Sequence, residues 1–249
     1  KGKTYYTRSR IKHVNGSLSD WSGGFEFDVI QQTNILNIIN TLGSSTWGIT
    51  IDPNGNLISS DNGTDKIYIY QGISNTVTSS FSSPGGNFPR GLTIDSNGNL
   101  ISCNSSTNPG KIYIHQGISS TITSSFDSPG DFPNGLTVDS NDNLISVDAG
   151  TNKIYIHQGI SSTINSSFDG PGNNTRGITI DSNGNLISSD SFTNPGKIYV
   201  HQGISSTITS SFDGPEVDPR GLTIDPNGNL IVVTYDSNNN PKFFVIELV

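Results

Sequence analysis

Residues 91–134 read GLTIDSNGNLISCNSSTNPGKIYIHQGISSTITSSFDSPGDFPN, and the chain repeats this pattern five times. The five copies are spaced by 43, 44, 42 and 44 residues and begin at Gly48, Gly91, Gly135, Gly177 and Gly221. A fixed period in the forties indicates a supersecondary unit that buries its faces only by packing against neighbouring copies. The repeat therefore decides the fold class.

Each copy contains four short segments typical of β-strands, which lie at 91–94, 100–103, 111–116 and 121–126 in the second copy. The first two are joined by Asp-Ser-Asn-Gly-Asn, where Asn-Gly predicts a type I′ hairpin turn because both residues tolerate a positive φ. Four antiparallel strands per unit of this length are typical of a propeller blade. We predict an all-β protein, a five-bladed β-propeller with four-stranded blades and a period of about 43 residues.

The two ends of the repeat region predict how the ring closes. The chain enters the repeat on a strand at 34–42, whose Leu42 aligns with Phe126 in a fourth strand, and it leaves on a third strand at 242–248. The last copy thus lacks only the strand that the N-terminal side supplies, and this pairing would remove two exposed sheet edges. We expect one propeller domain over residues 31–249, with its last blade closed by strand 34–42.

Residues 1–30 lie outside the repeat and read as a β-hairpin, with an alternating segment at 4–14, a turn, and an extended segment from Trp21. The segment resembles the last two strands of a fibronectin type III domain in Tyr5–Arg10, Asn15-Gly16, Ser19–Ser22 and Phe25–Phe27. The resemblance implies that Tyr5 is the tyrosine-corner residue.

An isolated hairpin is marginal in water, so the propeller, an upstream portion or a neighbouring subunit must cover this one. We favour a neighbouring subunit, contacted through the aromatic side chains of the hairpin, with strand addition as the hypothesised mode of contact. These side chains are Tyr5, Tyr6, Trp21, Phe25 and Phe27.

The repeat itself resembles the NHL family of propellers. The shared pattern is a Gly-initiated apolar strand, Asp-x-x-Gly-Asn-Leu, an Asp-ended second strand and Lys-Ile-x-Val/Ile; residues 48–69 follow it, and it recurs over residues 48–241. NHL-type rings commonly have six blades, so five copies are a departure. The resemblance implies a fold and carries no function with it, because one fold hosts many functions.

Composition excludes several classes of protein. A formal net charge of −8 argues against a phosphate-binding surface and hence against nucleic-acid partners. No apolar run is long enough to cross a bilayer. Cys103 is the only cysteine and is expected to be a small packing residue.

The absence of methionine and the start at Lys1 indicate a processed or partial chain. We expect an extracellular location or one at the surface of a cell or virion.

One residue precedes the first strand of each copy, and in propellers the first strand is the innermost. We therefore expect these residues to ring one mouth of the central channel. Three guanidinium groups and an indole could hold a carboxylate or the face of a sugar; alternatively they pair with nearby carboxylates or carbonyls and only close the channel. The residues are Trp47, Arg90, Asn134, Arg176 and Arg220.

The histidines and turns suggest metal sites but do not satisfy metal chemistry. His115, His157 and His201 share one repeat position, where the first copy has Tyr70, and rotation about the ring separates them too far to converge on one zinc ion. We expect them to pack at strand ends. The Asp-x-Asn-Gly-Asn turns lack the glycine and glutamate spacing of a calcium loop, so they are expected to be Asx-capped turns. No metal and no cofactor are predicted.

Polar residues end the second strands at Asp61, Asn104, Asp148 and Asp190, and we expect the adjacent loop backbone to satisfy them. Five sequons could also carry glycans in a source that glycosylates. Their acceptors are Asn15, Asn62, Asn104, Asn165 and Asn173.

The chain carries no P-loop, HExxH or GxSxG motif, and near-identical copies do not supply the asymmetry of an active site. We predict a non-enzymatic extracellular structural or interaction protein: a subunit of a surface appendage, fibre or filament that forms a homo-oligomer or polymer through its N-terminal hairpin. One alternative is a lectin-like propeller that binds carbohydrate or another ligand multivalently. A second is an NHL-type lactonase or lyase.

Overall fold

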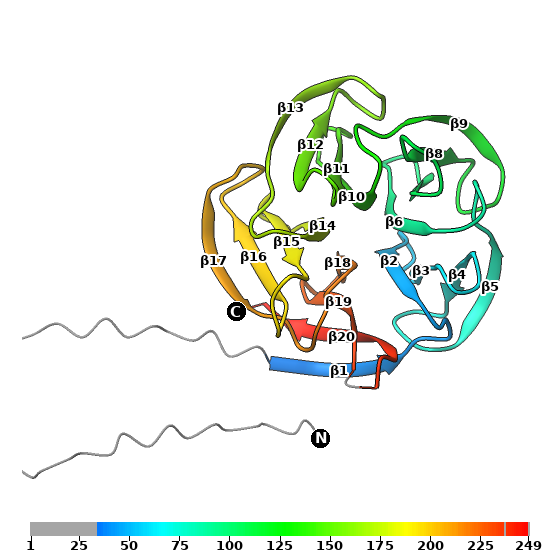
Figure 1. Cartoon of the computed structure of the whole chain (residues 1–249). Helices are drawn as coiled ribbons and strands as arrows, with labels where there is room; N and C mark the ends of the chain where they lie inside the picture. Colours follow the sequence, from blue (N-terminus) through cyan, green and yellow to red (C-terminus); the bar gives the residue numbers. More distant parts are fainter. Residues whose placement is uncertain (1–33, 237, 249) are drawn as a thin grey trace, which may run out of the picture.

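The computed structural model describes residues 34–236 and 238–248, which form five four-stranded antiparallel sheets around a central axis (Figure 1). This confirms the predicted all-β, five-bladed propeller. The N-terminal hairpin at 1–30 lies outside the described residues, and with it the predicted contacts of Tyr5, Tyr6, Trp21, Phe25 and Phe27 and the sequon at Asn15.

Four blades are each built from consecutive strands, with the first strand nearest the axis and the fourth at the periphery (Figure 1). Blades 1 and 2 contain β2 (Thr46–Ile51), β3 (Leu57–Asp61), β4 (Lys66–Tyr70) and β5 (Val77–Ser82), then β6 (Pro89–Ile94), β7 (Leu100–Asn104), β8 (Lys111–His115) and β9 (Ile122–Asp127). Blades 3 and 4 contain β10 (Pro133–Val138), β11 (Leu144–Asp148), β12 (Lys153–His157) and β13 (Ile164–Asp169), then β14 (Thr175–Ile180), β15 (Leu186–Asp190), β16 (Lys197–His201) and β17 (Ile208–Asp213).

The closing blade joins the two ends of the repeat region, as predicted. Its strands are β18 (Leu222–Ile224), β19 (Leu230–Tyr235), β20 (Pro241–Glu247) and, outermost, β1 (Asn34–Asn40), which pairs antiparallel with β20. The predicted alignment of β1 is wrong by three residues. Ile39, not Leu42, occupies the place of Phe126, because Ile39 is the side chain that reaches the core beside Phe243, whereas Leu42 is 59 % exposed.

The hydrophobic core lies between blades rather than within them. In one cluster, Ile58 and Ile67 of blade 1 pack against Leu92 and Leu100 of blade 2, and the other clusters likewise draw side chains from adjacent blades. The second strands β3, β7, β11 and β15 are buried at every position. A single blade therefore cannot bury its own faces, which explains why the copies fold as a closed ring.

The turns between first and second strands differ from the predicted type I′ geometry. In the turn after β6, Gly98 N–H donates to the Asp95 carbonyl at 3.0 Å, and the positive φ is confined to Gly98, at 79°. This is a type I turn followed by a glycine bulge. The Asp95 carboxylate causes it by accepting hydrogen bonds from the N–H groups of Asn97 and Asn99, at 3.0 and 2.7 Å. The Asx-capped turn is confirmed.

Candidate functional site

The five glycines that open the repeats pack directly against the backbone of the next blade. A Cβ on Gly48 would lie 2.2 Å from the carbonyl oxygen of Arg90, and one on Gly221 would lie 2.4 Å from that of Trp47. The three remaining glycines meet the equivalent carbonyl at 2.4 to 2.6 Å. None of the five has a positive φ, so this ring of glycines is required by close backbone approach and not by backbone conformation.

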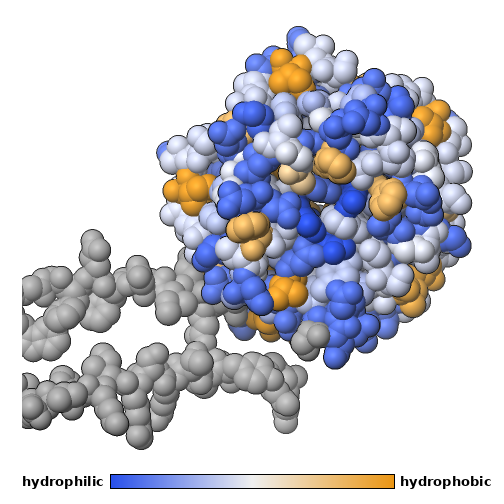
Figure 2. Space-filling model, in the orientation of Figure 1, coloured by the Kyte–Doolittle hydropathy of each residue, from blue (hydrophilic) through white to orange (hydrophobic). Residues whose placement is uncertain are grey.

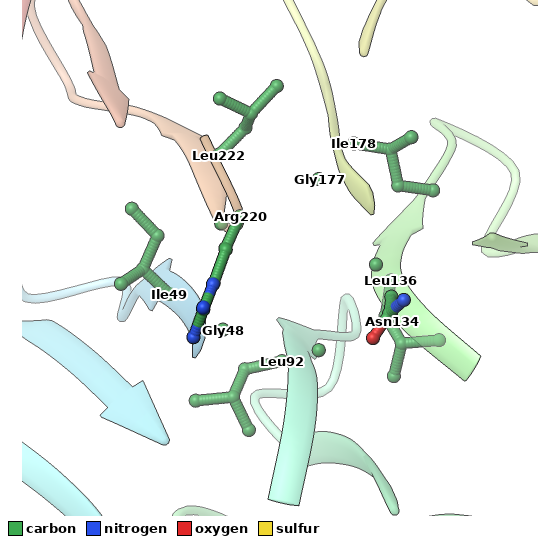
Figure 3. A pocket seen from close by; sticks show the side chains of 12 residues that line it. Gly48, Ile49, Leu92, Asn134, Leu136, Gly177, Ile178, Arg220 and Leu222 are labelled. Atoms are coloured by element: carbon green, nitrogen blue, oxygen red, sulfur yellow. The ribbon is translucent and has the colours of Figure 1, made fainter. Parts of the chain in front are cut away.

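The glycine ring nearly closes the central channel. The cavity at its level has a volume of about 10 Å³, about the space of one water molecule. First-strand residues of all five blades line it (Figure 3), among them Ile49, Leu92, Leu136, Ile178 and Leu222. The first strands are thus innermost, as predicted, and the channel has no room at this level for a ligand larger than water.

Four of the five predicted mouth residues come together on one indole. The guanidinium carbons of Arg90, Arg220 and Arg176 lie 3.4, 3.9 and 5.1 Å from the centroid of the Trp47 ring. Each distance lies in the range of cation–π attraction. The guanidinium groups cover the indole, so its faces are not free to stack on a sugar as the sequence suggested. Asn134, the fifth residue, is buried and lines the channel cavity together with Arg220 (Figure 3).

Asp218 holds two of the arginines. Its Oδ1 lies 2.7 Å from Arg176 Nη1, and its Oδ2 lies 2.6 Å from Arg220 Nη2. Arg220 Nη1 also donates to the Tyr235 hydroxyl at 2.8 Å. The sequence reasoning missed Asp218 and Tyr235, although an aspartate two residues before Arg220 is a visible departure of the last copy. We call Trp47, Arg90, Arg176, Asp218 and Arg220 the arginine mouth.

The arginine mouth carries more positive than negative charge. Burial lowers the pKa of Arg90 to about 10, and it also lowers the pKa of Arg176 against the opposing effect of Asp218. Within residues 34–236 and 238–248, Arg90 forms no ion pair; its Nε donates to Ser105 Oγ at 3.1 Å. Hydrophilic side chains gather around the central hollow in the space-filling view (Figure 2).

We expect Asp218→Asn to lower the free energy of unfolding by about 2 kcal/mol, because it removes the ion-pair partner of two partly buried arginines. Urea unfolding followed by circular dichroism measures the loss. Asp213→Asn is the control, since it breaks an exposed pair with Lys197 worth well under about 1 kcal/mol. Equal losses in the two variants would show that Asp218 does not neutralise the mouth.

The three repeat histidines are internal packing residues, as predicted. His115 is fully buried; its Nε2 lies 2.8 Å from Ser102 Oγ, and its Nδ1 lies 2.6 Å from the Ser119 carbonyl oxygen. The carbonyl requires a proton on Nδ1, so Nε2 accepts from the serine hydroxyl. His157 and His201 repeat this arrangement. Burial lowers the pKa of all three rings, which keeps them neutral.

The polar residues that end the second strands bond to neighbouring loops, which confirms their predicted structural role. Asp61 accepts the N–H groups of Ser45 and Thr64, and Asp148 accepts those of Phe132 and Thr151. Asp190 likewise accepts backbone N–H groups on both carboxylate oxygens.

One predicted glycan acceptor is corrected by the fold. Asn104 is 1 % exposed, and its Nδ2 lies within hydrogen-bonding distance of three loop carbonyl oxygens, the shortest being that of Asn87 at 2.8 Å. The folded chain therefore cannot present this amide for glycosylation. Asn62, Asn165 and Asn173 are half-buried or exposed, and their glycosylation stays a prediction.

Two further observations concern only the described part of the chain. No three histidine, cysteine, aspartate or glutamate side chains there are grouped so as to hold a metal ion. The same residues form no helix capable of spanning a membrane.

Comparison with solved structures identifies the fold and no closer relationship. Glutaminyl cyclase of Myxococcus xanthus aligns with a TM-score of 0.68 at 14 % identity, covering 86 % of this chain and 95 % of the cyclase. Virginiamycin B lyase of Staphylococcus aureus aligns with a TM-score of 0.52 at 21 % identity, covering 83 % and 67 %. The WD40 propeller domain of Doa1 aligns with a TM-score of 0.55 at 13 % identity, covering 78 % and 61 %.

No protein-family model matches the chain, and no curated protein matches it. The resemblances to NHL repeats and to fibronectin type III therefore stay predictions. At these identities the likeness to a cyclase and a lyase is a likeness of fold alone, because one fold hosts many functions.

Proposed function

We propose that this chain is a non-enzymatic extracellular interaction protein, which assembles with further copies of itself through its closing blade and the N-terminal residues that precede it. The observation that carries the proposal is the apolar surface of β1. Leu36 is 48 % exposed and Ile38 is 51 % exposed. The corresponding positions of blade 2 are the polar residues Thr123 and Ser125.

A second copy is the occupant that this surface favours. Among the described residues, β1 pairs with β20 on one side only, so its outer edge is available to pair with another strand. Residues 1–33 run directly into β1 and bring five aromatic side chains with them. An apolar strand edge next to an aromatic-rich segment suits self-association better than it suits an isolated ring.

The internal chemistry supports a non-enzymatic role. The histidines are bonded to serines and carbonyls, the second-strand aspartates are bonded to loop N–H groups, and the channel is nearly closed. The extracellular location is supported by the weakly charged, Asn- and Ser-rich composition and by the fibronectin-like segment. Assembly into an appendage, fibre or filament follows if each copy both offers and receives this contact.

We expect Leu36→Thr with Ile38→Ser to weaken self-association at least tenfold, because both side chains then match the polar outer strand of blade 2. Light scattering across a concentration series gives the mass of the native chain and of the variant. Ile208→Thr is the matched control, since Ile208 is an exposed isoleucine on the outer strand β17. The control should associate like the native chain. The proposal fails if the native chain stays monomeric, or if the Leu36→Thr, Ile38→Ser variant associates as strongly as the control.

A further inference from the structure

We propose that the arginine mouth is a binding site for a carboxylate, with Arg90 as the residue that receives it. The site is independent of the self-association proposed above and lies on the channel axis rather than on β1. Three guanidinium groups share one indole there, and Asp218 is the one carboxylate that pairs with them among the residues described. An anion is the ligand that this surplus of positive charge favours.

Asp218 already shows how a carboxylate fits this mouth. Arg176 Nη1 meets Oδ1 at 2.7 Å, while Nε and Nη2 of Arg220 meet Oδ2 at 2.8 and 2.6 Å. A planar carboxylate is thus held between two guanidinium groups by short, charge-assisted hydrogen bonds. The geometry of the mouth therefore matches the class of ligand that we propose.

Arg90 has the donors that a second carboxylate needs. Its Nε donates to Ser105, and its guanidinium carbon lies 3.4 Å from the Trp47 centroid, but its two terminal amino groups have no hydrogen-bond partner in the described part of the chain. Neither amino group is fully buried. The fully buried side-chain N and O atoms that lack a hydrogen-bond partner in the described part of the chain belong to Asp65, Ser128 and Ser191, and not to Arg90. The edge of the guanidinium thus remains open to a ligand.

Within the described residues, no acidic side chain forms an ion pair with Arg90. Asp61, Asp148 and Asp190 accept backbone N–H groups of neighbouring loops. Burial lowers the pKa of Arg90, with Arg176 and Arg220 among the smaller causes, which means that its charge is poorly stabilised in the free protein. A bound anion would stabilise the positive charge of Arg90. Because the channel below admits only about one water, the carboxylate must be a terminal group that enters from outside.

Such a carboxylate could come from the C-terminus of a peptide or from an acidic sugar, and the two sources can be told apart. Trp21→Phe leaves Trp47 as the sole tryptophan, so its fluorescence reports on the mouth. Titration with N-acetylalanine and, separately, with glucuronate at low salt should give a saturable change with at least one. The tighter probe identifies the source, and a lack of saturable change with both would overturn the proposal.

Charge-matched variants test Arg90 in the same background. We expect Arg90→Gln to weaken binding of the tighter probe at least tenfold, because it removes the charge and part of the fork. Lys66→Gln removes the same charge from an exposed position on the third strand of blade 1 and should change the affinity less than twofold. Equal effects of the two variants would refute a site at Arg90.

Asp218→Asn keeps the proposal testable if Arg90→Gln does not fold. Removal of the internal carboxylate frees Arg176 and Arg220 for the ligand, so the same probe should bind about tenfold more tightly. A residue with a purely structural role would not tighten binding when it is lost. Unchanged or weakened binding in Asp218→Asn would contradict the proposal.

Discussion

Gly48→Ala is expected to lower the free energy of unfolding by about 3 kcal/mol, as overpacking against fixed backbone does. The new Cβ would lie 2.2 Å from the Arg90 carbonyl oxygen and 2.9 Å from the Cα of Gly91, and both atoms belong to the next blade. Neither atom can move without displacing that blade. Because each of the five glycines packs against the next blade in the same way, a displacement at one contact affects the whole ring. Urea unfolding monitored by far-ultraviolet circular dichroism measures the loss.

The matched control is Gly150→Ala. This glycine also has no positive φ, and its Cβ would lie 2.8 Å from the ring edge of Phe132 and 3.3 Å from Asp148 Oδ1. The closer group, the Phe132 side chain, is half exposed and can rotate away, and no backbone atom is among these contacts. We expect a change below about 1 kcal/mol, partly offset by the reduced freedom of the unfolded chain. Similar losses in the two variants would mean that the glycine ring does not hold the blades together.

The second large effect is a fall in stability under mild acid. The pKa values of His115, His157 and His201 are lowered by burial, whereas the unfolded chain protonates its histidines near pH 6.5. Above this pH both states are neutral and the three residues contribute no pH dependence. Below it the unfolded state binds protons that the folded state does not, so the free energy of unfolding falls as the pH decreases.

The free energy of unfolding falls by up to about 1.4 kcal/mol per pH unit for each histidine, and by up to about 4 kcal/mol per pH unit for the three together. The fall continues until the pH reaches the pKa values of the folded state. Urea unfolding at half-unit steps from pH 7.5 to about 5.5 measures it. The triple variant with tyrosine at these positions is the control, because Tyr70 occupies the same place in blade 1 and bonds Ser59 at 3.1 Å. We expect a flatter profile in the variant; parallel profiles would exclude the histidines as the cause.

Much of the fold could be predicted from the repeat because its signals are local and recur in phase. The strand ranges, the blade count and the closure by β1 follow from alternation and period alone. The register of β1 could not be predicted, since NILNIIN offers several apolar side chains and only the packing of Ile39 beside Phe243 selects one. The predicted type I′ turn between the first and second strands was wrong, because the Asp95 carboxylate, rather than the Asn-Gly pair, sets the geometry of the turn.

The candidate site was predictable in outline only. Its members were found because first strands are innermost, which places one residue per blade at the same mouth. The partner Asp218 occurs in one copy and escaped an argument built on what the copies share. The stacking of the arginines on Trp47 depends on side-chain directions that sequence spacing does not specify.

Electron cryo-microscopy of the purified full chain tests most directly whether the closing blade is an assembly surface. The account predicts five-bladed rings joined in pairs or longer arrays, with β1 and the residues before it at each contact. Single rings at concentrations well above those used for light scattering, or rings joined through another blade, would contradict it.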